Sequence, residues 1–321
     1  MASREHRAPQ NYMDPDWAYF LGLLVARGEI SKDSRKIVID FPKGSLIAEG
    51  LSGNKYNKDV ELRLAVGDIE KRLYRLLGQT VDAHNAEGSI QLKIEFPTNS
   101  MACRNLQLHL KGKRSYREFE IPAEIFEAGL PEQKEFVRGF CDLAASIRKS
   151  NADQTKRHRI YIDILNPNWR LPIQLCALLQ ERLKVPVANI LWGHPNLRES
   201  KVRKRGTTWA REHQIRIFAD AFEPIGFYIG YKNKILKELA EANRRKGVHA
   251  ARLCNPHPRV KGKTERKPVH PEENNIKIPA AIRGKHFNAY WQICVGMGCK
   301  QARKPDPNQA EMFNLGQDEK A

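Results

Sequence analysis

The sequence predicts an α+β protein built from two similar halves and followed by a basic extension. A short apolar helix pattern occurs at residues 20–30 and again at residues 137–147, and each copy leads into a strand rich in basic residues. The strand patterns at 36–41 and 159–164 also match, with a basic residue, an apolar alternation and an Asp at the same places. These two pairs of segments indicate an internal duplication.

In the first half the elements follow the order helix, strand pair, helix, strand pair, helix. Apolar residues spaced three to four apart mark the helices, and strict alternation marks the strands. After the first motif, these patterns predict a strand at 36–41, a helix at 67–77 ending at Gly78, strands at 89–96 and 105–110, and a helix at 122–128.

The second half repeats this order. Residues 130–136 start the helix that contains the second motif, and the patterns then predict a strand at 159–164, a helix at 171–183, a strand at 213–218 and a helix at 232–242. From about residue 243 the composition changes to Lys, Arg and Pro, which is typical of an extended basic linker. We therefore expect an N-terminal half at 1–129, a C-terminal half at 130–243 and an extension at 244–321.

The charge of the chain favours a polyanionic partner. Fifty-five Lys and Arg residues stand against 37 Asp and Glu, for a formal net charge of +18 among 321 residues. An excess of this size is typical of proteins that bind nucleic acid, and the alternative is a basic protein whose charge only keeps it soluble.

Other features of the sequence indicate where the protein works. The first 16 residues are polar, and the longest apolar run, 17–26, is too short to cross a bilayer. The six Cys residues are thinly spread and lie mostly in apolar patterns, so reduced packing residues are expected. These observations predict a soluble intracellular protein, cytoplasmic or in the nucleoid, with no membrane partner.

Gly22 and Gly139 occupy matching places in the two motif helices. A residue without a side chain lets two helix backbones approach closely. We expect both glycines to lie where the motif helices pack against each other.

The paired motifs, each with its Gly and its closing small residues, resemble the LAGLIDADG homing-endonuclease family over about residues 16–242. Segments 225–228 and 232–236 are also similar to members of that family. The resemblance implies two pseudo-symmetric αββαββα halves, joined through the motif helices of a monomer, with double-stranded DNA as the partner. The family also includes proteins that lost cleavage and kept nucleic-acid binding, as RNA maturases or bacterial transcription regulators.

The resemblance further implies that each motif supplies one acid to divalent metal ions that activate water at the scissile phosphate. At those positions this chain has Arg27 and Ala144. Mg²⁺ requires oxygen ligands, which neither residue supplies, so we expect no metal, no cofactor and no cleavage, and expect Arg27 to contact a phosphate. The alternative is an active Mg²⁺-dependent endonuclease that uses Glu29, Asp142 or other non-standard acids, although helix geometry directs Glu29 and Asp142 away from the replaced positions.

The outward faces of the strands carry mixed polar residues, which suit base reading in the major groove. If the apolar residues of each strand face the core, the other face carries Lys36, Val38, Asp40, Gln91, Lys93, Glu95, Asn105, Gln107, His109 and Lys111 in the first half, and Arg157, Arg159, Tyr161, Asp163 and Arg216 in the second. A solvated sheet face without a partner is the alternative.

Basic residues between the strands are candidates for phosphate contacts, which add affinity but carry no sequence information. The candidates are Lys43, Lys111, Lys113, Arg114, Arg148, Lys149, Lys201, Arg203, Lys204 and Arg205, and Asn166 is a further candidate for DNA contact.

Four residues of the extension could hold a structural Zn²⁺. Cys254 and His257 form one pair of ligands, and Cys294 and Cys299 form a loosely spaced second pair. One buried Cys, one exposed Cys and a loop His are the favoured explanation of these residues, and zinc is the less favoured alternative.

The sequence therefore predicts a site-specific double-stranded DNA-binding protein that has lost metal-dependent cleavage. The alternatives are an active endonuclease and an RNA-binding maturase.

Overall fold

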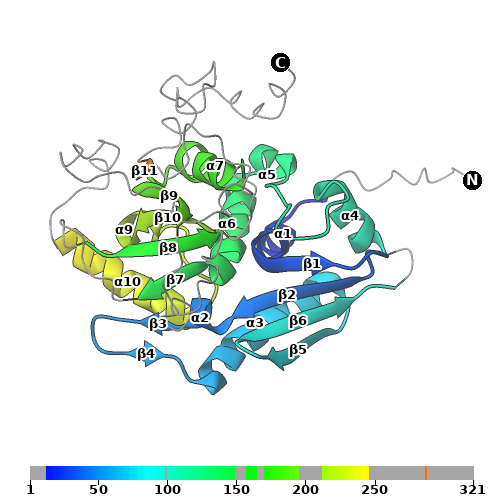
Figure 1. The fold of residues 1–321 in the computed structure, drawn as a ribbon, viewed down its shortest axis with the longest axis horizontal. Helices are drawn as coiled ribbons and strands as arrows, with labels where there is room; N and C mark the ends of the chain where they lie inside the picture. Colours follow the sequence, from blue (N-terminus) through cyan, green and yellow to red (C-terminus); the bar gives the residue numbers. More distant parts are fainter. Residues whose placement is uncertain are drawn as a thin grey trace, which may run out of the picture.

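The computed structural model describes residues 12–97, 100–148, 157–164, 170–194 and 212–245, together with the short strand 286–287. Two halves meet along two neighbouring helices, α1 (Pro15–Arg27) and α6 (Leu130–Ala144) (Figure 1). Each half continues from its helix into a strand pair, another helix, a second strand pair and closing helices. This order confirms the predicted α+β fold class with two pseudo-symmetric halves.

The first half contains a four-stranded antiparallel sheet in the order β1-β2-β6-β5. Its strands are β1 (Gly28–Ile30), β2 (Lys36–Pro42), β5 (Val81–Ala86) and β6 (Ser89–Glu95), and its other helices are α2 (Lys43–Leu46), α3 (Asp59–Leu77), α4 (Met101–His109) and α5 (Ala123–Glu127). Helix α3 packs on β5 and β6 and lies behind the sheet in Figure 1.

The second half contains the larger sheet, in the order β11-β9-β10-β8-β7-β3-β4. Its own strands are β7 (Ala145–Arg148), β8 (Arg159–Ile164), β9 (Asn189–His194) and β10 (Glu212–Phe218), with β11 (His286–Phe287) at one edge. Its helices are α7 (Arg170–Ala177), which continues into the π-helical turn η1 (Leu178–Arg182), then α9 (Ala219–Phe222) and α10 (Gly230–Arg245).

Local sequence explains where the main helices begin and end. The Asp14 side chain accepts a 2.7 Å hydrogen bond from the amide of Trp17, and Pro15 occupies the first turn of α1, where no amide donor is needed. Helix α3 ends at Gly78, which has the left-handed φ of 60° and caps the helix as predicted. None of the helices in the described ranges is long and apolar enough to cross a membrane.

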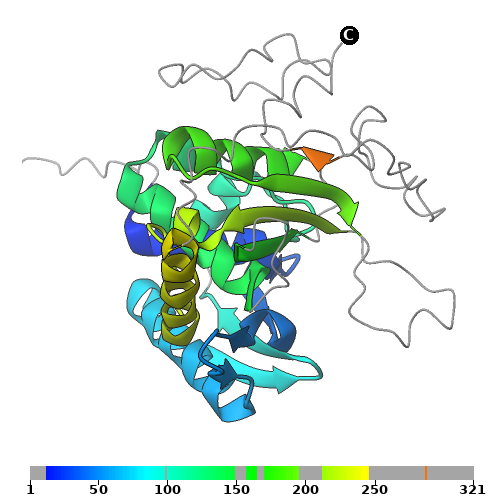
Figure 2. The ribbon, with the colours of Figure 1, turned by 90° about the vertical axis from the view of Figure 1, so that its left-hand side faces the viewer.

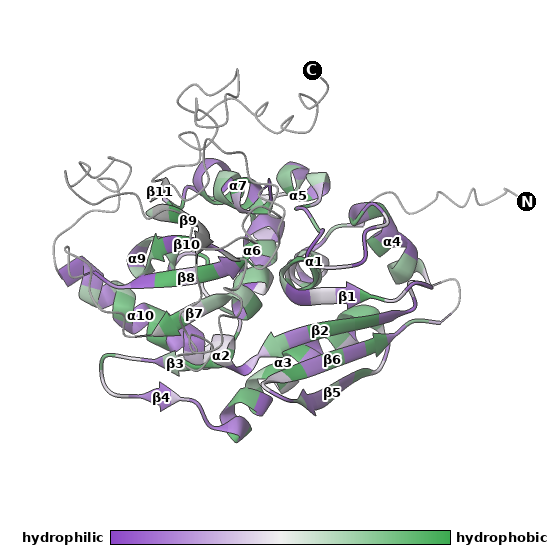
Figure 3. Ribbon diagram, in the orientation of Figure 1, coloured by the Kyte–Doolittle hydropathy of each residue, from purple (hydrophilic) through white to green (hydrophobic). Residues whose placement is uncertain are grey.

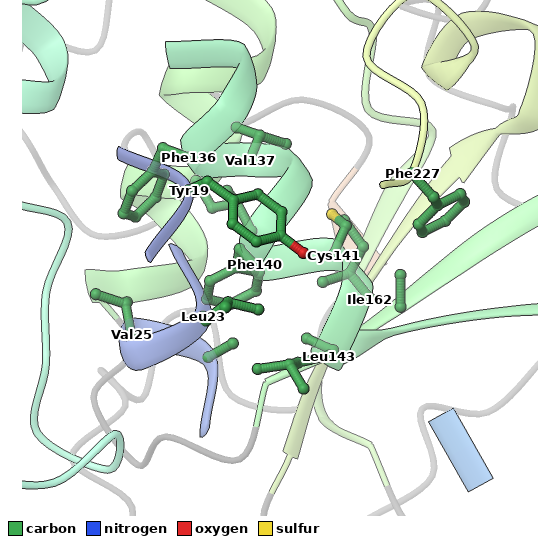
Figure 4. Close-up of a cluster of buried hydrophobic side chains, with 14 of the residues drawn as sticks. Tyr19, Leu23, Val25, Phe136, Val137, Phe140, Cys141, Leu143, Ile162 and Phe227 are labelled. Carbon is green, nitrogen blue, oxygen red and sulfur yellow. The ribbon is translucent and has the colours of Figure 1, made fainter. Parts of the chain in front are cut away.

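The two motif helices pack backbone against backbone. A Cβ on Gly22 would overlap the carbonyl oxygen of Phe136 and lie 2.8 Å from the amide nitrogen of Phe140. A Cβ on Gly139 would likewise overlap the carbonyl oxygen of Tyr19. Figure 4 shows Tyr19 among Phe136, Phe140 and other buried side chains at this joint. The predicted close approach at both glycines is confirmed.

An arm from the first half completes the sheet of the second half. The arm is the hairpin of β3 (Ala48–Glu49) and β4 (Lys55–Tyr56), and β3 pairs in parallel with β7. On α10, Tyr231 stacks on Tyr56 with ring centroids 4.8 Å apart, and Glu238 accepts from the amide of Ser52 at 2.6 Å. Figure 2 shows α10, in yellow, beside this blue hairpin. The two halves are therefore held together at a second place besides the motif helices.

The prediction of a strand at 105–110 is wrong, because these residues belong to α4 and the turn after it. The alternation of Leu106, Leu108 and Leu110 with polar residues imitated a strand. The second strand pair is instead the β5–β6 hairpin, which turns at Gly88 with φ of 75°. Asn105, Gln107 and His109 therefore do not extend the sheet, and His109 is buried beside Trp17 and Glu124.

Candidate nucleic-acid interface

The first sheet has one apolar face and one polar face, as predicted from its alternation. Ile37, Ile39 and Phe41 of β2 are fully buried. Along the opposite face of β2 and β6, the register places Lys36 opposite Glu95, Val38 opposite Lys93, and Asp40 opposite Gln91. Figure 3 shows the resulting alternation of hydrophobic and hydrophilic residues along β6.

The polar face of the first sheet carries both signs of charge. Asp82 and His84 of the edge strand β5 continue the rows of Lys93 and Gln91. Lys36 and Glu95 approach to 3.9 Å, and their side chains are 62% and 59% exposed, so this pair contributes little to stability and remains accessible. Gln91 donates a long hydrogen bond of 3.4 Å to Asp40. Donors and acceptors are thus presented in fixed rows.

The second sheet repeats this register. Asp163 of β8 lies opposite Gln214 of β10, as Asp40 lies opposite Gln91, and Tyr161 lies opposite Arg216. The Arg216 guanidinium lies 5.4 Å from the centroid of the Tyr161 ring, and its Nε donates a 2.9 Å hydrogen bond to Gln214. The polar faces of the two halves are therefore duplicated as well as their helices.

Asp163 is not placed to read a base, contrary to the sequence prediction. Only 4% of the residue is exposed, and its carboxylate accepts a 2.8 Å hydrogen bond from the side-chain amide of Gln214. The alternation assigned the correct face of β8, but packing covers this position. Tyr161 and Arg159 on the same face are partly exposed.

Arg157 also differs from its predicted place on the outward face. It lies before the start of β8, is 1% exposed and forms a 2.5 Å ion pair with Asp220. Its guanidinium carbon lies 4.1 Å from the centroid of the Phe218 ring. The alternation of β8 does not extend back to this residue, so Arg157 is a buried structural cation.

Arg27 ends α1 at the joint between the halves. It is 5% exposed, and its guanidinium donates to the carbonyl oxygens of Ala26, at 3.3 Å, and Asp163, at 3.5 Å. The second of these bonds crosses from the first half to the second. The guanidinium also lies 5.6 Å from the centroid of the Tyr116 ring. Little of Arg27 remains accessible for the phosphate contact that the sequence suggested.

The two positions at the ends of the motif helices supply no ligand for a divalent metal ion. A buried guanidinium repels a cation, and Ala144, at the end of α6, is 2% exposed and has no donor atom. Within the described residues, no group of three His, Cys, Asp or Glu side chains is arranged to hold a metal.

Asp142 acts as an internal anchor. It is fully buried, and its carboxylate accepts hydrogen bonds from the Tyr19 hydroxyl at 2.8 Å and from the amides of Tyr228 and Ile229. Burial raises the pKa of Asp142 to about 6. All its partners are internal groups, so the alternative that uses Asp142 as a metal ligand is not supported by its geometry.

The buried Lys232 lies at the end of α6, next to Asp142. Its ammonium group donates to the carbonyl oxygens of Asp142, at 2.9 Å, and Ala145, at 2.8 Å. These carbonyls are at the negative end of the helix, where a cation is favourable. Burial lowers the pKa of Lys232 to about 8, while the Asp142 carboxylate opposes this shift.

No family model and no curated protein matches this chain. Solved structures do match it, among them two of DUF199/WhiA and one of the homing endonuclease I-DmoI. The full-length DUF199/WhiA protein from Thermatoga maritima matches with a TM-score of 0.40 and 13% identity, over 76% of this chain and 64% of that one.

The N-terminal LAGLIDADG domain of DUF199/WhiA gives a TM-score of 0.35 and 12% identity over 66% and 78% of the two chains. The homing endonuclease I-DmoI, in complex with DNA and Mn, gives 0.33 and 14% over 70% and 96%. The chain thus spans 64% of the length of full-length WhiA.

The predicted basic loop after α4 lies along the free edge of β1. The amide of Ile30 donates to the carbonyl of Arg114 at 2.7 Å, and the amide of Tyr116 donates to the carbonyl of Gly28 at 2.8 Å. Arg114 and Lys111 are exposed, whereas Lys113 forms a 2.8 Å ion pair with Glu120. The loop therefore belongs to the sheet edge, close to the end of the first motif helix.

Tyr116 and Arg117 complete this loop and were missed from the sequence. Arg117 is exposed, its Nε donates a 3.4 Å hydrogen bond to the Tyr116 hydroxyl, and its guanidinium lies 5.6 Å from the Tyr116 ring centroid. The run of basic residues ending in Tyr-Arg was the available signal. Nothing in the sequence placed it against β1.

The other predicted DNA-contact residues either have partners within the protein or lie outside the described residues. Lys43 forms a 3.0 Å ion pair with Asp59, and the backbone of Arg148 pairs with Glu49 of the arm. The remaining candidates lie outside the described residues: Lys149, Asn166, Lys201, Arg203, Lys204, Arg205, Cys254, His257, Cys294 and Cys299.

Proposed function

We propose that this chain is a monomeric protein that binds double-stranded DNA at a preferred sequence and has no metal-dependent cleavage activity. The main support is the polar face of the first sheet, where Lys36, Asp40, Gln91 and Lys93 stand in fixed rows. Lys pairs with guanine, Gln with adenine, and Asp accepts from cytosine, so such rows can discriminate base pairs in the major groove.

The charge of the chain supports the choice of partner. The polar face of the first sheet is mixed in sign, whereas the whole chain carries a formal net charge of +18. This combination separates two tasks: the strand face selects bases, and the basic residues elsewhere supply affinity through phosphates. The pairing of Tyr161 with Arg216, which are both partly exposed on the second sheet, supports one protein molecule spanning two half-sites.

The proposal is tested by selecting binding sites from a random duplex pool and then measuring affinity for the winner by mobility shift. A preferred site is expected, with an affinity that falls steeply as salt rises and is unchanged by EDTA. Equal affinity for all duplexes would contradict site-specific binding. Preference for structured RNA over the selected duplex would instead support the maturase alternative.

One substitution, Glu29→Gln, distinguishes the endonuclease alternative from the proposed function. Glu29 is the exposed acid next to the end of α1. In a DNA-binding protein, removing this negative charge strengthens duplex binding, because it no longer repels phosphates. In a nuclease that uses Glu29 as a ligand, the same change abolishes Mg²⁺-dependent cleavage of a plasmid that carries the selected site. If the unaltered chain cleaves the plasmid and Glu29→Gln does not, the proposed loss of cleavage activity is overturned.

A further inference from the structure

Arg27 is a poor candidate for direct contact with DNA, although the sequence places it at the centre of the interface. Arg27 is 5% exposed, and its guanidinium donates hydrogen bonds to the carbonyl oxygens of Ala26 and Asp163. A buried cation at this place still creates a positive field. The neighbouring side chains therefore decide what can bind at the end of the first motif helix.

The segment from Arg114 to Arg117 is fixed against this end. Two backbone hydrogen bonds join it to β1, and the Ser115 hydroxyl donates a 2.8 Å hydrogen bond to the Glu29 carboxylate. Two further bonds, from the amides of Glu118 and Phe119 to the carbonyl of Ser115, close a turn that contains Arg117. Arg117 therefore lies in a turn that is fixed by hydrogen bonds beside Gly28.

Tyr116 connects the buried cation with the exposed one. The guanidinium carbons of Arg27 and Arg117 each lie 5.6 Å from the centroid of its ring. The ring attracts both cations, and its hydroxyl accepts from Arg117. Two guanidinium groups thus share one aromatic ring at the joint.

We propose that the Arg27–Tyr116–Arg117 cluster is a phosphate site, in which Arg117 contacts one backbone phosphate of the bound duplex. Tyr116 orients Arg117, and the buried Arg27 adds positive electrostatic potential to the site. An arginine side chain can donate two parallel hydrogen bonds to a phosphate, and this contact needs no divalent ion. The site rests on the proposed function, since it assigns the phosphate to the DNA backbone.

The nearby acids limit how strongly this site attracts an anion. Glu29 is exposed and adds a negative charge beside Arg117, although its carboxylate accepts from Ser115. Glu118 is also exposed in the same turn. Affinity at this site is therefore set by the guanidinium contact more than by the net charge of the loop.

The test compares Arg117→Ala with Arg63→Ala, using the full chain and the selected duplex. Arg63 is an exposed arginine on α3, behind the sheet, so it controls for the loss of one positive charge. Arg117→Ala is expected to weaken binding by about tenfold for all sequences and to lower the slope of log affinity against log salt by about 0.9. Arg63→Ala is expected to leave the slope unchanged.

Two further variants separate a phosphate contact from a structural role. Arg117→Lys keeps the charge and is expected to restore the salt slope but only part of the affinity, because Lys lacks the planar fork. Tyr116→Phe keeps the ring and removes the hydroxyl, and is expected to weaken binding by less than Arg117→Ala does. Thermal unfolding should be the same for both Arg117 variants and the unaltered chain, since the side chain is exposed.

The phosphate site is overturned if Arg117→Ala and Arg63→Ala bind alike with equal salt slopes, while the unaltered chain still prefers its selected duplex. In that case the proposed function stands and only the contact is wrong. If the unaltered chain does not bind duplex DNA at all, both proposals fail.

Discussion

The hydroxyl of Tyr19 donates a 2.8 Å hydrogen bond to the carboxylate of Asp142, which joins the first motif helix to the second. Both residues are fully buried. Burial raises the pKa of Asp142 to about 6, and burial together with the Asp142 carboxylate raises the pKa of Tyr19. The joint between the halves therefore contains a titratable group.

This group makes stability depend on pH. The pKa of Asp142 in the folded protein, about 6, lies above the ordinary value of 3.8 expected in the unfolded chain, so the folded state binds the proton more tightly. Its ionisation destabilises the folded protein above pH 6, and this cost is removed as pH falls from 6 towards 3.8. Lys232, with a pKa of about 8, stays protonated throughout this window.

Asp142→Asn should remove this pH dependence while keeping a hydrogen-bond acceptor for Tyr19. Between pH 7 and pH 5, the unaltered chain should gain about 1 kcal/mol of unfolding free energy relative to Asp142→Asn. Urea unfolding of both proteins at the two pH values measures this double difference. A difference of the opposite sign would show that Asp142 is ionised more easily in the folded protein.

Substitution of the joint glycines should separate the motif helices. Gly22→Ala or Gly139→Ala would place a methyl group against the backbone of the facing helix, and each should lower the unfolding free energy by about 2 kcal/mol or more. Gly67→Ala is the matched control, because a Cβ there meets no atom within 4 Å and alanine favours the helix. Urea unfolding should show losses for the first two variants and a small gain for the control.

The arm should be sensitive to its aromatic contact. Tyr56→Ala removes the stack on Tyr231 and should cost about 1 kcal/mol, with faster hydrogen exchange at the amide of Ile147 in β7. Tyr74→Ala, at a tyrosine that is 57% exposed on α3, should change neither quantity. Equal exchange rates at Ile147 in both variants would show that the stack does not hold the arm in place.

Base reading by the first sheet should be local to individual positions. Lys93→Ala should relax the preference for one base pair of the selected site, at a cost of about 1–3 kcal/mol in binding to the preferred sequence. Lys71→Ala removes an equally charged, exposed side chain from α3 and should not alter the preference. Repeating the site selection with each variant measures this. Identical selected sites from the unaltered chain and Lys93→Ala would remove Lys93 from the base-reading set.

Short-range sequence patterns predicted an element correctly where its packing in the folded protein agrees with the local pattern. The alternation of Ile37, Ile39 and Phe41 predicted the buried face of β2, and the matched glycines predicted the joint. The same rule failed at Leu106 and Leu108, because alternation over so few residues also fits a helix with one exposed apolar residue. It failed at Arg157 because the pattern was extended beyond the start of the strand.

Apart from the joint, the contacts between distant segments were beyond prediction from the sequence. The strands of the arm are two residues long each and gain their partners from β7 and α10, so no local pattern marks them. Asp163 has the predicted face but is buried by its surroundings, and Tyr116 becomes informative only when its loop lies against β1. Each of these outcomes depends on tertiary packing.

The β3–β4 arm has a mechanical consequence for recognition. Because a segment of one half is hydrogen-bonded into the sheet of the other, the angle between the two polar faces is fixed before any ligand arrives. A duplex that engages both faces must adopt the curvature that this angle sets, and stiff sequences pay more to bend than flexible ones. Sites selected from a random duplex pool should therefore be enriched in easily deformed pyrimidine–purine steps.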